Sequence, residues 1–371
     1  MRLPSRFPIP RTPRGCLVTG TVLAGLGVAL WFVPGVQYIA RAARGHFDLM
    51  LGAVPLEEGL AREDLTDRER DRLRLTARVK AYGEETLGLS PTRNYEKVNL
   101  DFDQVVWNVS GCEADRFESH MYRYPVVGAL PYIGYFDRAE ADAEAARLEA
   151  TGMDVWVRPS GAYSTLGWFQ DPLWRSHLKW SVERFSNTVL HELAHSTLWL
   201  PGEGKFNESF ASFVGDAAAE RFMGTIREER PEAYRRWQDG IAEGARYREF
   251  MHDLYTRLDT LYESGLGREA TLARKVEIID EARARYAAMD WELEGYRRAM
   301  GPDRVINNAR MMQFRVYRTG MDVFDEALAR FDGDLSAFLD AARTLPDLKK
   351  STKGPWNPFD AVATLSPSGA P

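Results

Sequence analysis

The pattern of apolar and polar positions separates a mixed first half of the chain from a helical second half. Residues 56–90 are rich in charge and carry apolar side chains at helical spacing up to Gly88 and Pro91, which predicts one or two amphipathic helices. From residue 95 to residue 136, runs of Val and aromatic residues are broken by prolines and glycines. This second pattern predicts short strands joined by turns.

The region after residue 136 adds one helix and two strands before the pattern becomes helical. Residues 137–152 are rich in Ala and Glu and end at Gly152, which predicts a helix. The stretches 153–159 and 161–169 predict two further strands. Helical spacing then predicts helices at 172–200, 207–226, 229–264, 268–299, 303–331 and 335–344. The expected fold class is therefore α+β.

The first 45 residues differ from the rest because they contain an apolar run from Gly15 to Val33, flanked by arginines on both sides. Such a run is near the lower limit for crossing a bilayer. More arginines precede it than follow it, which favours a cytoplasmic N-terminus. We therefore expect a single-pass membrane anchor, with everything after residue 45 outside the cytoplasm. A cleaved signal peptide is the alternative, since Ala40 and Ala42 have A-x-A spacing.

These patterns predict five segments along the chain. They are a membrane anchor at 1–45, a helical linker region at 46–94, a strand-containing lobe at 95–200, a helical lobe at 201–345 and an extended tail at 346–371.

Composition narrows the classes of function. The 371 residues are 44% hydrophobic and 27% charged, with a formal net charge of −6. No basic stripe or arm is present to neutralise phosphates, so we expect no nucleic-acid partner. The cysteines, Cys16 and Cys112, form no disulfide framework and no CxxC motif.

The segment HELAH, from His191 to His195, is the strongest chemical signal. Histidines four residues apart on a helix lie on one face, so both imidazoles can bind one metal ion. Zinc suits two imidazoles and a carboxylate, and Glu192 is placed next to the first histidine to deprotonate a water molecule. We therefore expect one zinc ion per chain. The alternative is that the two histidines make ordinary hydrogen bonds.

A catalytic zinc site needs a third protein ligand. The turn LPGEGKF reverses the chain after the histidine helix, and Asn207 is a good N-cap for the helix that follows. Glu208, on that helix, is our preferred ligand, because a rigid element positions a ligand better than a loop. Glu203, on the turn, is the competing ligand. Glu208 could also be an ordinary first-turn glutamate favoured by the helix dipole.

HELAH followed by FNESFASFVG (206–215) resembles the gluzincin metallopeptidases. A resemblance that covers more of the chain is to a bacterial family of predicted aminopeptidases with an N-terminal membrane or lipid anchor. It is carried by VVWNV (105–109), YPVVGALPYIGYFD (124–137), AYSTLGWFQDP (162–172), HELAH (191–195), FNESFASFVG (206–215) and INNARMMQFRVY (306–317). The resemblance implies a gluzincin-like (thermolysin-like) catalytic domain, in which a small mixed sheet with an edge strand precedes a mainly helical lobe.

The same resemblance implies a zinc metallopeptidase of the aminopeptidase type, with Glu192 as general base. It also implies a single-pass protein of a bacterial inner membrane, with the catalytic domain on the extracytoplasmic (periplasmic) side. Tyr317 is the first candidate for the donor that stabilises the oxyanion, although it also fits a core aromatic position. The strand expected at 161–169 would pair with extended substrate, so that Tyr163, Ser164 and Thr165 line the cleft. Asp171 and Glu203 are candidates for binding a substrate α-amine.

Three classes of function follow. The first is a zinc peptidase acting on a peptide or protein substrate. The second is a membrane-tethered zinc protein that binds peptides without catalysis, and the intact Glu192 argues against it. The third is a zinc hydrolase of a non-peptide substrate, which the sequence does not separate from the first.

Overall fold

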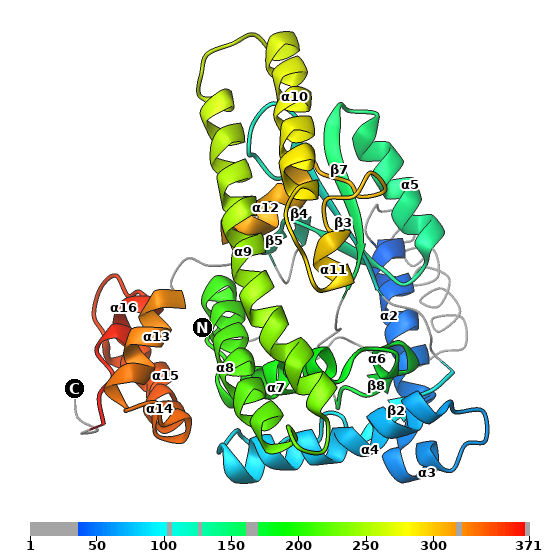
Figure 1. Ribbon diagram of the computed structural model, residues 1–371, viewed down its shortest axis with the longest axis vertical. Helices are drawn as coiled ribbons and strands as arrows, with labels where there is room; N and C mark the ends of the chain where they lie inside the picture. Colours follow the sequence, from blue (N-terminus) through cyan, green and yellow to red (C-terminus); the bar gives the residue numbers. More distant parts are fainter. Residues whose placement is uncertain (1–35, 102–105, 125–127, 161–169, 317–320, 368–371) are drawn as a thin grey trace, which may run out of the picture. The chain divides into compact units, whose positions relative to one another are not determined.

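The computed structural model describes residues 36–101, 106–124, 128–160, 170–316 and 321–367 (Figure 1). The chain falls into two compact units, residues 1–51 and 52–371. The described part of the first unit is helix α2 (Val36–Leu51).

Helix α2 bears on the predicted membrane anchor. It has 16 residues and includes Arg41, Arg44 and Asp48, so it is too short and too charged for a bilayer core. Across the described ranges, no helix combines the length and the apolar character needed to cross a membrane. This finding contradicts the predicted single-pass localisation in a bacterial inner membrane, and that prediction is withdrawn. The apolar run at 15–33, on which that prediction rested, lies outside the described residues.

The second unit contains three small sheets among its described residues. In the first sheet, β2 (Lys97–Asn99) pairs antiparallel with β1 (Val54–Pro55) and parallel with β8 (Leu173–Trp174). In the second, β3 (Trp107–Glu113) lies between β6 (Ile133–Tyr135) and β7 (Met153–Pro159), and both pairings are antiparallel. The third is the hairpin of β4 (Tyr122–Tyr124) and β5 (Gly128–Leu130).

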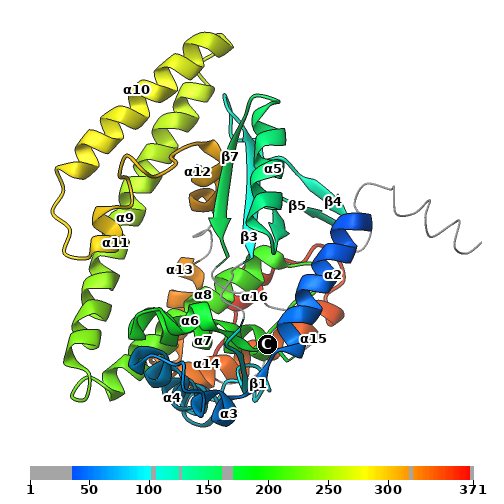
Figure 2. The same ribbon diagram turned by 90° about the vertical axis from the view of Figure 1, so that its right-hand side faces the viewer.

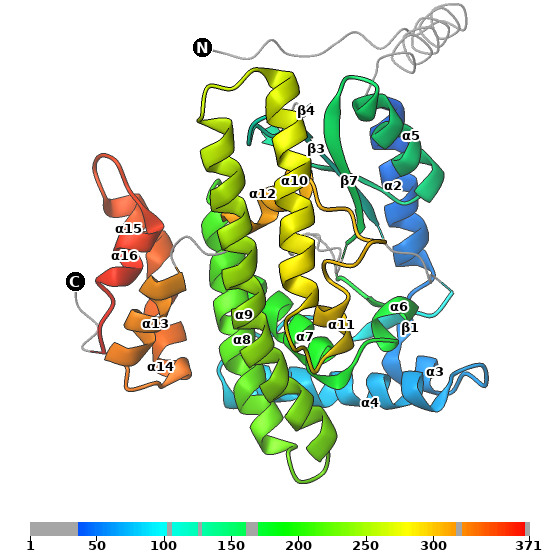
Figure 3. The same cartoon turned by 45° about the horizontal axis from the view of Figure 1, so that its top comes forward.

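Helices form the remainder of this unit. They are α3 (Leu56–Leu60), α4 (Asp67–Ala81), the π-helix η1 (Tyr82–Thr86), α5 (Arg138–Glu149), α6 (Arg175–Leu178), α7 (Val182–Thr197), α8 (Gly204–Thr225), α9 (Pro231–Tyr262), α10 (Arg268–Ala287), α11 (Glu294–Arg297), α12 (Asn308–Val316), α13 (Met321–Arg330), α14 (Leu335–Ala342), α15 (Leu345–Ser351) and α16 (Pro358–Ala363). Figure 3 shows α9 and α10 as a long antiparallel pair.

The sheet built on β3 has a helix on each face. Helix α5 covers one face, where its Leu148 lies against Gly111 and its Arg138 stacks over Trp107. Helix α12 covers the other face, and its Asn308 donates a backbone hydrogen bond to Asp154 on β7 (2.7 Å). Figure 2 shows α5 and α12 on these opposite faces. The Asp154 side chain of β7 therefore points toward α12.

Helices α7 and α8 pack against each other within the larger hydrophobic core. Three phenylalanines of α8 are fully or almost fully buried and contact Phe324 of α13, with ring centroids 5.3–6.0 Å apart. They are Phe206, Phe210 and Phe213. Burying side chains of this size stabilises the fold by about 1.5–3 kcal/mol each. The helix pair is therefore a rigid support for the side chains on its exposed side.

The extended tail predicted for residues 346–371 is wrong, because this stretch contains most of α15 and all of α16. Pro346 and Pro358 lie in the first turns of these helices, where proline costs no hydrogen bond. Asn357 caps α16 by accepting from the Phe359 amide (3.0 Å), and Val362 is fully buried. The prolines therefore lie at the starts of helices and do not mark an extended segment.

Candidate metal centre

Helix α7 carries two histidines on one side of a mostly buried helix. It begins after Ser181, whose backbone is extended (φ −66°, ψ 159°), and its Leu190 and Leu193 are completely buried. His191 and His195 are one turn apart, and their ring centroids lie 4.8 Å from each other at 87°. The four-residue spacing thus brings both imidazoles to the same place.

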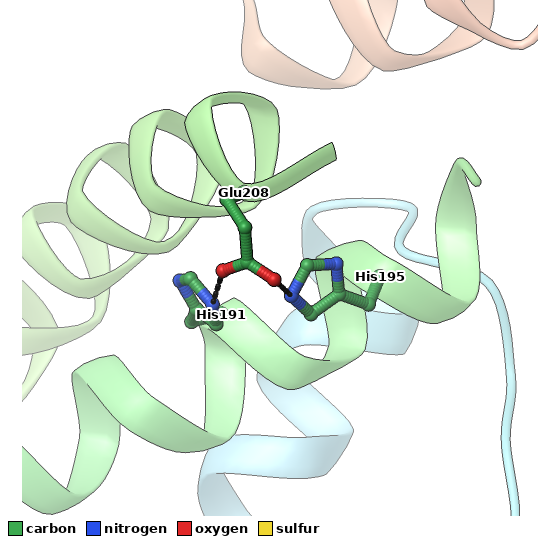
Figure 4. A group of neighbouring side chains, drawn as sticks. All are labelled: His191, His195 and Glu208. Atoms are coloured by element: carbon green, nitrogen blue, oxygen red, sulfur yellow. Dashed lines mark ion pairs between the residues drawn. The ribbon is translucent and has the colours of Figure 1, made fainter. Parts of the chain in front are cut away.

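Helix α8 brings a carboxylate to these imidazoles (Figure 4). Glu208 Oε2 lies 3.8 Å from His191 Nε2, and Glu208 Oε1 lies 3.7 Å from His195 Nε2. One ligand atom from each residue lies within 4.8 Å of the others. Among the described residues, no other group of three His, Cys, Asp or Glu side chains is arranged in this way.

Burial keeps both imidazoles neutral near pH 7. Loss of hydration lowers the pKa of His191 to about 4, and burial together with the neighbouring His191 lowers the pKa of His195 to about 3. Each ring therefore offers a lone pair to a metal. Burial also raises the pKa of Glu208, whose side chain is nevertheless 64% exposed. The carboxylate is partly desolvated and still open to water.

This donor set fits zinc. Two imidazoles and a carboxylate, with one position left open, are a known ligand set of catalytic zinc. Tetrahedral zinc with ordinary bond lengths holds its ligand atoms roughly 3.3–3.6 Å apart. The distances of 3.7 and 3.8 Å run to different oxygens of Glu208, and one ligand atom from each residue lies within 4.8 Å of the others. Zinc binding would therefore require the side chains to draw these three atoms closer together.

Asn207 fixes the turn that delivers Glu208. Its Oδ1 accepts from the Leu200 amide and its Nδ2 donates to the Leu200 carbonyl, both at 2.9 Å, and the side chain is fully buried. The predicted N-cap role is therefore wrong: α8 begins three residues earlier, at Gly204, and Asn207 lies inside it. By binding both backbone groups of Leu200, the Asn207 side chain ties the start of the turn to α8, next to the candidate ligand Glu208.

Gly215 sets how closely α8 approaches His191. A Cβ atom at this position would lie 3.0 Å from both Cα and Cβ of His191 and 3.2 Å from its backbone nitrogen. These neighbours belong to the centre of α7, so they cannot move aside as a flexible side chain would. The absence of a side chain at residue 215 is what allows the two helices to meet at the candidate ligand.

Gly215→Ala is expected to weaken zinc binding about 10-fold or more, because α7 and α8 must separate where His191 and Glu208 converge. Gly224→Ala is the matched control on the same helix: a Cβ there meets nothing within 4 Å, and alanine favours the helix by about 1 kcal/mol. Zinc affinity by competition with a chromophoric chelator measures both. Equal affinities in the two variants would show that helix spacing does not set the site.

Of the other carboxylates considered, Glu192 follows His191 in α7 and is 8% exposed. Glu203 lies apart from the three ligand atoms and pairs with Lys349 Nζ at 2.9 Å, so the turn glutamate is already engaged. Asp171 is buried, and its backbone carbonyl accepts from the Tyr95 amide (2.8 Å).

Four predicted site residues lie outside the described residues. They are the residues predicted to line the cleft, Tyr163, Ser164 and Thr165, and the predicted oxyanion donor, Tyr317.

Acidic groups of the site act on two tyrosines that the sequence analysis did not single out. Tyr95 is buried at a positive φ of 63°, and burial and the charges of Glu192 and Asp171 raise its pKa well above the usual value. Partial burial and the Glu208 carboxylate raise the pKa of Tyr132. Tyr132 lies within the family-like segment 124–137, which was a usable signal. The positive φ of Tyr95, by contrast, has no recognisable signal in the sequence.

The chain matches a family model described as "Putative aminopeptidase" over residues 37–355. No curated protein and no solved structure matches it.

Proposed function

Since the chain belongs to the family described as "Putative aminopeptidase", we propose that it is a zinc-dependent peptidase holding one zinc ion per chain. The family points to a peptide or protein substrate. His191, His195 and Glu208 are the proposed ligands, and Glu192 is the proposed general base. The observation that carries the proposal is the convergence of two neutral imidazoles and a carboxylate from two packed helices.

When bound, zinc supplies the Lewis acidity that peptide hydrolysis requires. The Glu192 carboxylate accepts the proton of the attacking water and passes it to the nitrogen of the leaving amine. Its place beside His191 on a buried helix keeps that carboxylate at a fixed position relative to the ligands. The exposed side of Glu208 leaves the approach of substrate open.

The proposal extends to the fold, which we take to be gluzincin-like. Two features support it: a helix with both histidines packs against a helix with the glutamate, and a small sheet built on β3 precedes them in the chain. In the described residues the edge strands of that sheet are β6 and β7, whereas the edge strand expected at 161–169 lies outside them.

The test uses the purified full chain. We expect roughly one zinc per chain by plasma mass spectrometry and hydrolysis of peptides, lost on removal of zinc with a chelator and restored by adding zinc back. Aminoacyl fluorogenic substrates and internally quenched peptides, compared side by side, separate aminopeptidase from endopeptidase activity. Absence of bound zinc under metal-replete conditions would refute the proposal and favour a peptide-binding module.

A further inference from the structure

Arg158 is an arginine whose charge has no acidic counterpart in the described structure. It lies near the carboxyl end of β7 and is partly buried. Its Nε atom is buried without a hydrogen-bond partner among the described residues, and the side chain makes no ion pair with any of them. The guanidinium lies over the ring of Trp156, 5.2 Å from its centroid. A buried guanidinium nitrogen without an acceptor is costly, which calls for a partner.

The neighbours of Arg158 on its own face of the sheet do not supply that partner. Asn108 is directly opposite on β3, and Trp156 is two residues back on β7. The acid on the same face, Asp154, is four residues back, about 13 Å along the strand. Asp154 is already held by buried Lys275 and by the Asn308 amide (2.7 Å). The acid of this face is therefore used to join β7 to α10 and α12.

Arg158 is the second-last residue of β7. Figure 2 shows β7 running with its carboxyl end directed toward α7 and α8, the helices that carry the candidate ligands. The strand therefore presents the end that contains Arg158 to the helices of the metal centre.

We propose that Arg158 recognises a carboxylate of the peptide substrate, bound with its scissile bond at the metal centre. The planar fork of a guanidinium matches a carboxylate with two parallel hydrogen bonds, and the Nε atom is one of the donors that such a pair uses. The carboxylate comes either from the C-terminus of a short peptide or from an acidic side chain. This inference rests on the proposed peptidase function and adds the class of substrate.

Binding is measured by calorimetry with the full chain carrying Glu192→Gln, so that peptides are not consumed. The probes are trialanine, trialanine amide, and two amidated tripeptides whose middle residue is either glutamate or glutamine. We expect the probe with the recognised carboxylate to bind more tightly than its neutral match, on the order of 10–100-fold. Arg158→Gln abolishes this preference, and Arg158→Lys keeps part of it. Preference for trialanine assigns the C-terminal carboxylate, and preference for the glutamate peptide assigns a side chain.

Arg138→Gln is the matched control, since Arg138 also stacks on a tryptophan of this sheet but on the other face, with Asp142 as its partner (2.8 Å). It keeps the wild-type preference. The inference is overturned if wild type shows no carboxylate preference, or if the preference survives in a folded Arg158→Gln protein. Repeating the titrations on metal-free protein separates failure of this inference from failure of the proposed function. If the protein binds no zinc but still shows the Arg158-dependent preference, only the proposed function fails. If it hydrolyses peptides without any carboxylate preference, the proposed function stands and only the role of Arg158 fails.

Discussion

Replacing Glu208 with alanine is expected to lower zinc affinity by more than about 100-fold, since loss of a group that merely supports a ligand already costs 10–100-fold. The Glu208 carboxylate bridges both imidazoles at 3.7 and 3.8 Å, so its removal leaves two ligands on one helix. The side chain is 64% exposed, and substitutions at such positions change the free energy of unfolding by about 0.5 kcal/mol or less. Loss of zinc in this variant would therefore result from the missing ligand and not from unfolding. Zinc content after dialysis against a weak chelator measures the change.

The matched control for this variant is Glu203→Ala. Glu203 was the competing ligand, and the structure pairs it with Lys349 across the turn, so its loss should leave zinc content unchanged. A thermal scan adds a second readout, because a ligand at 100 times its dissociation constant stabilises the folded state by about 2.7 kcal/mol. Wild type and Glu203→Ala should gain that stabilisation on zinc addition, and Glu208→Ala should not. The opposite pattern would assign the third ligand to the turn.

The candidate metal centre was readable from the sequence because its geometry is local. Two histidines one turn apart on an amphipathic helix have few other arrangements, and the reversal LPGEGKF requires the next helix to return along the first. What the pattern does not encode is how closely the helices approach. That distance depends on Gly215 lying against the backbone of His191 and on Asn207 holding Leu200. Both are tertiary contacts without a signature in spacing or composition.

The failures of the sequence interpretation have a common cause in residues with two roles. Proline breaks a helix in its interior but is favoured in the first turn, so Pro346 and Pro358 are compatible with a tail and also with the helices α15 and α16 that they begin. Asparagine caps helices and also pairs with a peptide group through both side-chain atoms, and Asn207 does the second. Only the neighbours in space decide between such roles.

The sequence did not predict a role for Arg158 or Tyr132, and the reason is different. Arg158 occupies an ordinary position in a strand, and its interest arises only because Asp154, the acid of its face, is already bound to Lys275. Tyr132 follows the hairpin of β4 and β5, far from Glu208 along the chain. Juxtapositions of this kind join segments that are far apart in the sequence, so no local pattern encodes them.

Glu192→Gln is expected to lower kcat by about 10²–10⁴-fold while zinc content stays at the wild-type level. Glutamine has the shape of glutamate but cannot accept the proton of the attacking water, and Glu192 is not one of the three converging ligand residues. Because the side chain is 8% exposed, the isosteric replacement avoids the cavity that alanine would leave.

Glu183→Gln is the matched control for this last variant, since it makes the same chemical change nine residues earlier on α7. Glu183 pairs with Arg236 at 3.2 Å, away from the ligands, so its neutralisation removes one partly exposed ion pair worth roughly 0–1 kcal/mol. We therefore expect wild-type kcat and zinc content in Glu183→Gln. Full activity in zinc-loaded Glu192→Gln would place the proton transfer on another group, whereas zinc loss in that variant would make Glu192 a ligand. A fall in kcat with zinc retained, absent from the control, assigns the base to Glu192, because the two variants differ only in where along α7 the charge is removed.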